Sequence, residues 1–189
     1  MALRQQSSGD AFAPGGEAHD AGAPGLGAHH LDAYNVVLST IPSDSHTWNL
    51  LFLQLLLEEH GCEVTNLGAC VPVATLVGES AQSRPDLIVI SSVNGHGLEE
   101  GRDLARAVRA HPELRHVPLV IGGKLDTAGS QSEDDFLPLL EAGFDAVLVG
   151  ETAVPRLLAL LEQLPAPAAR PIAPSLSGLE QKAYADATR

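Results

Sequence analysis

The sequence is poor in the residues that several classes of protein require. Its 189 residues carry 11 Lys and Arg against 24 Asp and Glu, for a net charge of −13, and aromatic side chains make up only 4%. Nucleic acids and anionic membranes are bound by clustered Lys and Arg, so this balance argues against both partners. No apolar run approaches the roughly 20 residues that a membrane span needs. We therefore expect a protein that binds neither nucleic acid nor membrane.

Cysteine is equally scarce. Cys62 and Cys70 are the only two, and they give neither a disulfide framework nor a zinc-binding pattern. No apolar run follows Arg4, so a secretory signal is not expected. The two thiols are expected to remain reduced, and the predicted location is the cytoplasm.

Hydrophobic residues, at 44% of the chain, suffice for a core built from Leu, Val, Ile and Ala. We expect that core within residues 32–164. Residues 1–31 are rich in Gly, Ala, Pro and Ser, and they are predicted to form a disordered N-terminal arm because they bury too little apolar surface to offset the entropy of ordering. Residues 165–189, which include PAPAARPIAP, are predicted to form a low-complexity C-terminal tail.

Short apolar segments alternate with amphipathic ones between the two ends. Strands are predicted at 34–41, 63–68, 86–92, 117–123 and 144–150, and helices at 46–61, 73–83, 97–112, 132–143 (broken or bent near Pro138) and 152–164. This alternation predicts an α/β fold with a parallel sheet covered on both faces. The flavodoxin-like (Rossmann-like), doubly wound order 2-1-3-4-5 suits a sheet of this size. Its ligand site would lie outside the carboxyl ends of the strands, where the winding reverses.

The loop after the first strand contains Ser43, Asp44 and His46. A neutral imidazole is a good ligand for a transition metal, and a carboxylate on its other ring nitrogen would fix the tautomer and raise the basicity. The alternative interpretation is that Ser43 or Asp44 caps a helix and that His46 lies in its first turn.

Small residues follow three other strands. The segments are Ser91-Ser92-Val93-Asn94-Gly95-His96-Gly97, Gly122-Gly123 and Gly150-Glu151-Thr152. Each segment alone is consistent with a tight turn, but small residues also let a ligand approach the backbone closely. In the predicted topology all of them fall on the edge of the sheet where ligands bind.

These loops resemble the D-x-H-x-x-G, S-x-L and G-G signatures of cobalamin-binding domains in which a histidine replaces the cofactor's own base. The resemblance covers about residues 33–164. It is nearest to the small (S) subunit of methylaspartate mutase, also called glutamate mutase. The shared patterns are an S-D-x-H opening, a V-x-x-L-G second strand, an S-S-x-x-G-x-G loop and a G-x-D-x-V segment before the last strand.

The resemblance implies a role for each residue. His46 would be the axial cobalt ligand, Asp44 would hydrogen-bond it, and the displaced nucleotide tail would enter a slot between the sheet and its helices. The residues expected around the cofactor are Ser91, Val93, Gly95, Gly122 and Gly123, with Ser43 and Thr152 as further candidates.

Two positions depart from the family pattern. Asn49, preceded by Trp48, stands in place of the final glycine of the first motif, and Val93 stands in place of the leucine of S-x-L. The side chain at position 49 either crowds the nucleotide tail or hydrogen-bonds to it.

The resemblance implies a function that the chain cannot perform alone. It would carry adenosylcobalamin for a carbon-skeleton mutase (an isomerase) that interconverts glutamate and 3-methylaspartate, while a large barrel-type subunit supplies the substrate site. No catalytic residue is expected in this chain. One alternative is a corrinoid carrier for methyl transfer, although residues 1–31 are not expected to form the helical bundle that such carriers usually have. Another alternative is a cobalamin-binding accessory or sensor protein.

Overall fold

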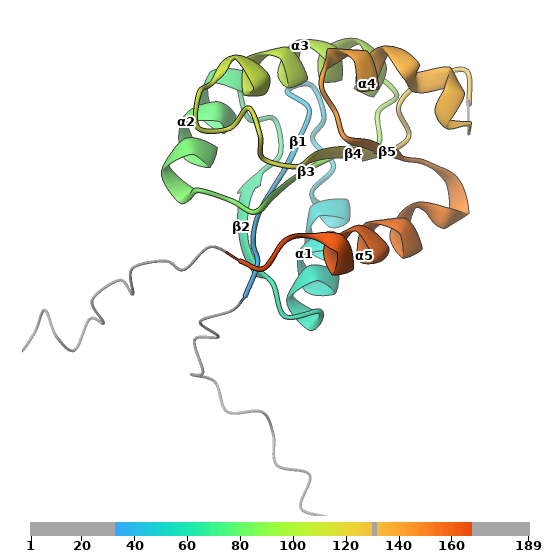
Figure 1. The fold of residues 1–189 in the computed structure, drawn as a ribbon. Helices are drawn as coiled ribbons and strands as arrows, with labels where there is room; N and C mark the ends of the chain where they lie inside the picture. The colour runs from blue at the N-terminus through green and yellow to red at the C-terminus, as the bar shows by residue number, and fades with distance from the viewer. Residues whose placement is uncertain (1–32, 130–131, 168–189) are drawn as a thin grey trace, which may run out of the picture.

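The computed structural model describes residues 33–129 and 132–167 and contains a five-stranded parallel sheet between two layers of helices (Figure 1). The strands are β1 (Asn35–Thr40), β2 (Glu63–Gly68), β3 (Leu87–Ser92), β4 (Leu119–Gly123) and β5 (Ala146–Leu148), in the order β2-β1-β3-β4-β5. The predicted flavodoxin-like order is confirmed. The expected arm at 1–31 and most of the expected tail at 165–189 lie outside the described residues.

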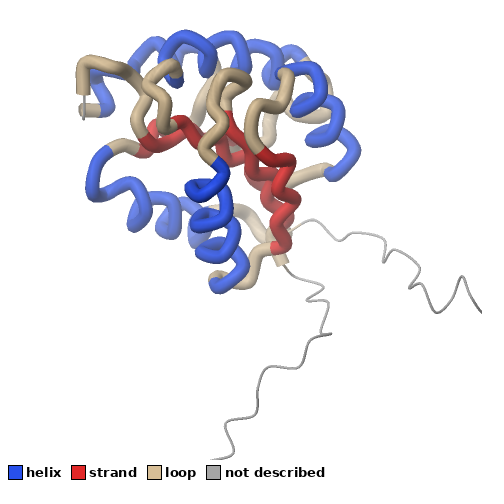
Figure 2. Tube along the Cα trace, turned by 180° about the vertical axis from the view of Figure 1, so that it is seen from behind, coloured by secondary structure: helices blue, strands red, loops and turns tan. Residues whose placement is uncertain are grey.

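Five α-helices connect and cover the strands. They are α1 (Thr47–Glu59), α2 (Val73–Ser83), α3 (Gly97–Ala110), α4 (Leu137–Ala142) and α5 (Ala153–Gln163), with short 3₁₀ turns at Glu133–Phe136 and Gly150–Thr152. Helices α2, α3 and α4 cover one face of the sheet, while α1 and α5 lie against the other (Figures 1 and 2). Within the described ranges, no helix has both the length and the apolar content to cross a bilayer.

The sheet is buried because its central strands are apolar throughout. Every residue of β1 and β3 is buried, as expected for parallel strands with helices on both faces. Leu104 and Phe136 belong to the core on the α2–α4 side, and Leu50 and Leu157 to the core on the α1–α5 side. The core on the α1–α5 side includes only a few buried residues from these two helices, such as Leu50 and Leu157.

One predicted helix is interrupted where expected, and one predicted strand is shorter than expected. The helix expected at 132–143, broken or bent near Pro138, is divided into a 3₁₀ turn and α4, and Pro138 lies in the first turn of α4. Proline is tolerated in the first turn of an α-helix, but it has no N–H and cannot lie in the interior of a longer helix without disrupting it. The strand expected at 144–150 is shortened to Ala146–Leu148. It pairs only with β4, and the chain turns away at Gly150 with a φ of +69°.

Candidate functional site

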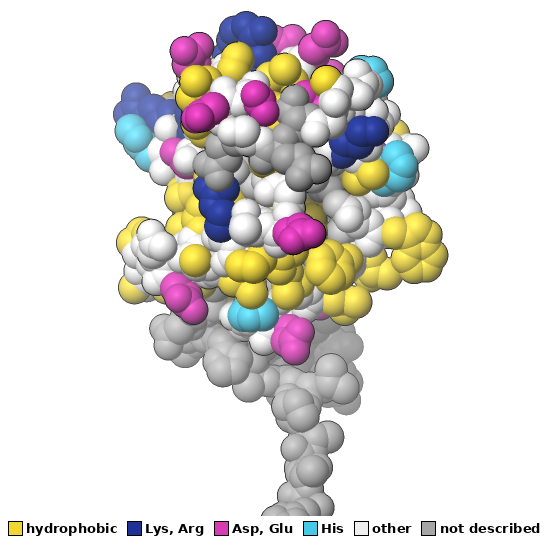
Figure 3. All heavy atoms as spheres, turned by 90° about the vertical axis from the view of Figure 1, so that its right-hand side faces the viewer, with side chains coloured by type: hydrophobic (Ala, Val, Ile, Leu, Met, Phe, Trp, Pro, Cys, Tyr) yellow, Lys and Arg dark blue, Asp and Glu magenta, His cyan; other side chains and the backbone are white. Residues whose placement is uncertain are grey.

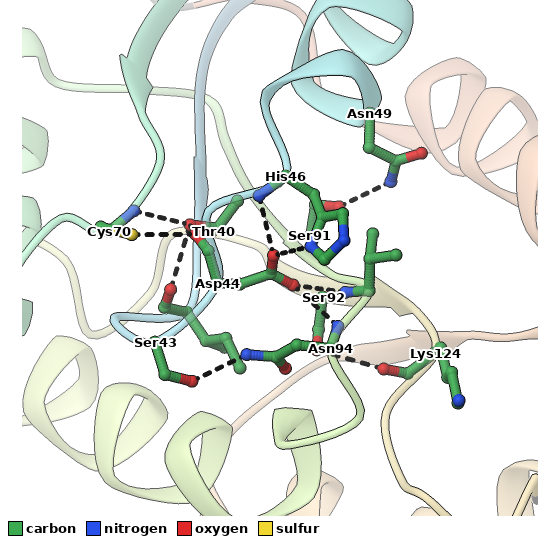
Figure 4. Close-up of polar contacts among 12 residues, drawn as sticks. Thr40, Ser43, Asp44, His46, Asn49, Cys70, Ser91, Ser92, Asn94 and Lys124 are labelled. Carbon is green, nitrogen blue, oxygen red and sulfur yellow. Dashed lines mark hydrogen bonds and ion pairs between the residues drawn. The ribbon is translucent and has the colours of Figure 1, made fainter.

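The strand register brings three of the predicted loops to one edge of the sheet. Thr40 of β1 pairs with Ser91 of β3, and Ser91 and Ser92 pair with Gly122 and Gly123 of β4. The carboxyl ends of these strands therefore end side by side. The polar contacts between their loops are drawn in Figure 4.

Asp44 lies at the centre of this edge with none of its surface exposed. One carboxylate oxygen accepts hydrogen bonds from the backbone N–H of His46 (3.0 Å) and from Nδ1 of its ring (2.6 Å). The other oxygen accepts from the backbone N–H groups of Val93 and Asn94, the second at 3.1 Å. Asp44 thus joins the β1 loop to the β3 loop and holds the imidazole ring.

These contacts set the charge of Asp44. Burial by itself would raise the pKa of Asp44, but the N–H donors just described together hold that pKa below its ordinary value of 3.8. Asp44 is therefore a carboxylate at neutral pH. Because it accepts a hydrogen bond from Nδ1 of His46, the lone pair of the neutral ring is on Nε2.

The position of His46 leaves that nitrogen accessible. His46 is the residue before α1, its side chain makes no helix-capping bond, and the side chain is 53% exposed. The alternative in which His46 lies in the first helical turn is therefore wrong. His46 offers one nitrogen ligand at the mouth of the sheet, and among the described residues no group of three or more His, Cys, Asp or Glu gathers as a metal cluster.

The loop that carries Asp44 is fixed from its backbone side as well. The carbonyl oxygen of Asp44 accepts from the Thr40 hydroxyl (2.8 Å) and from the Cys70 N–H (3.1 Å). On the outer side, the Asn94 amide donates to the Ser43 hydroxyl at 2.9 Å. Contacts from the loops after β1, β2 and β3 thus hold the Asp44–His46 pair in place.

A slot of about 180 Å³ opens beside this pair, between the sheet and helices α1 and α5. Most of its walls are apolar, and its lining includes two polar side chains, Asn49 and Ser91, which are hydrogen-bonded to each other at 2.7 Å. In Figure 3, where the right-hand side of Figure 1 faces the viewer, hydrophobic side chains gather across the lower half of the molecule, where α1 and α5 lie. The lining residues are Asn49, Phe52, Leu53, Val89, Ile90, Ser91, Gly122, Gly123, Leu148, Ala153, Val154 and Leu157.

Close backbone contacts require the two glycines at the end of β4. A Cβ on Gly122 would lie 2.8 Å from the carbonyl oxygen of Leu148. A Cβ on Gly123 would lie 2.1 Å from that of Ser92, and Gly123 has a φ of +105°. The slot wall at this edge is therefore bare backbone.

We expect Gly123→Ala to lower the free energy of unfolding by about 2 to 4 kcal/mol, because the methyl group adds a backbone clash to an unfavourable φ. Gly61→Ala is the matched control, since Gly61 has a φ of +80° but open space around its Cβ; the control should lose only about 1 kcal/mol. Urea denaturation measures both values. Equal losses would show that the contact with Ser92 carries no cost.

The structure distributes the predicted residues unequally around the site. Ser91, Gly122 and Gly123 line the slot. Val93 contributes its backbone N–H to Asp44. Gly95 packs against the backbone of Asp126 in the loop after β4, outside the slot lining.

The two further candidates lie at the surface. Ser43 is exposed and accepts the hydrogen bond from Asn94. Thr152 is exposed in the 3₁₀ turn before α5, and the residues after it, Ala153 and Val154, line the slot in its place.

Sequence reasoning missed Asn94 and the apolar walls of the slot. In the sequence, the wall residues on α1 and α5, such as Phe52 and Leu157, cannot be distinguished from ordinary core residues. One feature of the sequence could have indicated the slot, because α1 carries more apolar residues than the single face of a helix that packs on a sheet can bury. Trp48 is 81% exposed and Leu55 57%, and Leu51 and Phe52 are exposed as well.

Comparison with known proteins identifies a family for most of the described part of the chain. The family model described as B12 binding domain matches residues 34–158. The glutamate mutase sigma subunit of Treponema denticola is 32% identical over 120 residues, which are 63% of this chain and 85% of that protein. The HTH-type transcriptional repressor CarA of Myxococcus xanthus is 38% identical over 88 residues, which are 46% of this chain and 30% of that protein.

Solved structures share the fold. The monomethylamine corrinoid protein of Methanosarcina barkeri superimposes with a TM-score of 0.55 at 18% identity, covering 67% of this chain and 57% of that one.

Proposed function

The chain belongs to the B12 binding domain family, and on that premise we propose that it holds adenosylcobalamin with Nε2 of His46 as the lower ligand to cobalt. The observation that carries this proposal is the Asp44–His46 pair, in which a buried carboxylate binds Nδ1 at 2.6 Å and leaves Nε2 with its lone pair on a half-exposed ring. A single imidazole suits this cofactor, because the corrin ring supplies the equatorial nitrogens itself.

Asp44 is proposed to tune the ligand. A carboxylate that accepts from the far nitrogen fixes the ring orientation and makes Nε2 more basic. The low pKa of Asp44 keeps this partner charged at neutral pH. Because backbone N–H groups of two loops hydrogen-bond Asp44, the imidazole ring of His46 is oriented before the cofactor binds.

The slot supports the second half of the proposal. It lies between the sheet and helices α1 and α5, its walls are largely apolar, and glycine backbone forms one side. Such a slot fits a flat heteroaromatic base better than a charged group. We assign it to the nucleotide tail of the cofactor, with Ser91, Gly122 and Gly123 as contacts.

We further propose that the chain is the small subunit of a mutase that interconverts glutamate and 3-methylaspartate. Support comes from the sigma-subunit relative, of which the chain covers 85%. When bound, adenosylcobalamin supplies radical chemistry. The residues of this chain bind and orient the cofactor and exclude water from its tail, while a larger, barrel-type subunit carries the substrate site.

The α1 face beside His46 is the proposed contact for that larger subunit. Trp48, Leu51, Phe52 and Leu55 are all exposed there, and apolar patches of this kind mark interaction sites. This apolar face of α1 begins next to the proposed cobalt ligand, since Trp48 follows His46 by two residues. A partner subunit that covers the upper side of the cofactor would therefore also contact the α1 face.

Reconstitution tests the mutase assignment. The chain, adenosylcobalamin and the large subunit encoded in the same genome should together form 3-methylaspartate from glutamate, and omission of any component should abolish the product. His46→Ala should be inactive, and His60→Ala, at the exposed end of α1, should be active. A chain that retains cobalamin but yields no product overturns the mutase assignment and favours a methyl carrier or a sensor.

A further inference from the structure

Asn49 brings an amide into an otherwise apolar part of the slot. Its Nδ2 donates to the hydroxyl of Ser91 at 2.7 Å. Ser91 is buried and Asn49 is half-buried. Apolar side chains of α1, β3 and α5, such as Phe52, Val89 and Leu157, surround the pair in the slot lining. Polar groups placed in this way fix the orientation and identity of a ligand.

The pair has hydrogen-bonding capacity to spare. A carboxamide has an acceptor oxygen and two N–H donors, and a hydroxyl has one O–H donor. The one contact described uses a single Asn49 N–H and an acceptor site on Ser91. Within the part of the chain that the structure describes, no other partner is found for Oδ1 of Asn49 or for the hydroxyl hydrogen of Ser91. The slot therefore presents an acceptor and donors at the point where Asn49 of α1 meets Ser91 of β3.

We propose that Asn49 selects the base of the nucleotide tail, favouring a cobamide whose lower base is a purine such as adenine over one with dimethylbenzimidazole. The inference rests on the proposed function, because it assigns the slot to the tail. It names a specificity-determining residue at the position where the resembled motif has glycine.

The chemistry of the two bases supports this choice. Adenine has an amino donor next to a ring-nitrogen acceptor, and a carboxamide can pair with both at once. The outer edge of dimethylbenzimidazole carries methyl groups that can do neither. When that base fills the slot, Oδ1 of Asn49 loses water without gaining a partner. A buried polar group left unpaired is costly, so sites built to hydrogen-bond a ligand discriminate against analogues that cannot.

Equilibrium titration with three corrinoids tests the proposal. The probes are cobalamin, the cobamide with adenine as its lower base, and cobinamide, which lacks the nucleotide tail. The wild-type chain should bind the adenine cobamide roughly five- to tenfold more tightly than cobalamin. Asn49→Leu, which keeps the branched volume without the amide, and Asn49→Ala should bring the ratio to within about twofold.

Gln54→Ala is the matched control. It removes another amide from α1, but Gln54 bonds Glu58 and Asn66 and lies outside the slot lining. Its ratio should equal that of the wild-type chain. Cobinamide affinity should be the same in every variant, which shows that each is folded.

The outcomes separate the two proposals. A wild-type preference for cobalamin, or a preference for adenine that persists in both Asn49 variants, overturns the role of Asn49 while leaving cofactor binding intact. Failure of the wild-type chain to bind any of the three corrinoids overturns the proposed function and this inference with it.

Discussion

Replacing His46 with alanine is expected to weaken cobalamin binding by about 100-fold or more, since loss of a residue that merely supports a metal ligand already costs roughly 10- to 100-fold. In this variant the cofactor keeps only the contacts of the slot. The buried Asp44 beneath the ring remains paired with the backbone of Val93 and Asn94, so the fold should persist. Gel filtration of the chain mixed with cobalamin, with the visible spectrum of the protein peak, measures retention.

His60→Ala is the control for this experiment. His60 is exposed at the end of α1, and Nδ1 of its ring is hydrogen-bonded to the carbonyl oxygen of Leu56. It should retain cobalamin as the wild-type chain does. If His46→Ala and the wild-type chain retain equal amounts, cobalt ligation by His46 is wrong.

The second large effect concerns Asp44. We expect Asp44→Ala to lower the free energy of unfolding by about 2 to 4 kcal/mol, because it leaves the partly buried backbone N–H groups of Val93 and Asn94 without this acceptor. It should also weaken cobalamin binding by roughly 10- to 100-fold, because nothing then orients the His46 ring. Urea denaturation and cobalamin titration check the two effects. Asp103→Ala, which removes an exposed carboxylate paired with Arg106, should change the free energy of unfolding by at most about 0.5 kcal/mol.

The pH dependence of stability provides an independent check on Asp44. Its folded-state pKa lies below the ordinary value of 3.8, so between the two values the unfolded chain binds more protons. The stabilisation is therefore complete above the unfolded pKa and is lost as the pH falls through the folded pKa. Urea denaturation below about pH 4 should show this loss in the wild-type chain and not in Asp44→Ala. A pH dependence identical in both chains would contradict the account.

The sequence predicted the strand order because hydrophobic periodicity is strong where strands are buried on both faces, as in β1 and β3. It predicted for the same reason that the loops of the candidate site lie together at one edge of the sheet, since parallel strands place their carboxyl ends side by side. It predicted a helix broken or bent near Pro138, as the structure has it, but it predicted the ends of β5 poorly. There, local backbone effects outweigh the apolar pattern.

The sequence did not identify which residues form the walls of the slot. Phe52 and Leu157 are apolar and occur at the helical spacing of core residues, and only the structure shows that α1 and α5, on the same face of the sheet, leave a cavity beside them. Asn94 binds Asp44 through its backbone N–H, and no side-chain motif predicts a contact of that kind. Asn49 was noticed as a departure from a motif, but its partner Ser91 lies 42 residues away and became visible only in the fold.

Electron paramagnetic resonance of bound cob(II)alamin tests the central claim, that a histidine nitrogen of this chain ligates cobalt, most directly. The chain is prepared with ¹⁵N-labelled histidine and compared with an unlabelled sample and with labelled His46→Ala. The account predicts that the label converts the triplet splitting of the axial nitrogen into a doublet, and that labelled His46→Ala shows no such conversion. A triplet that survives the label would mean that the cofactor's own base stays on cobalt, which would contradict the assignment of both His46 and the slot.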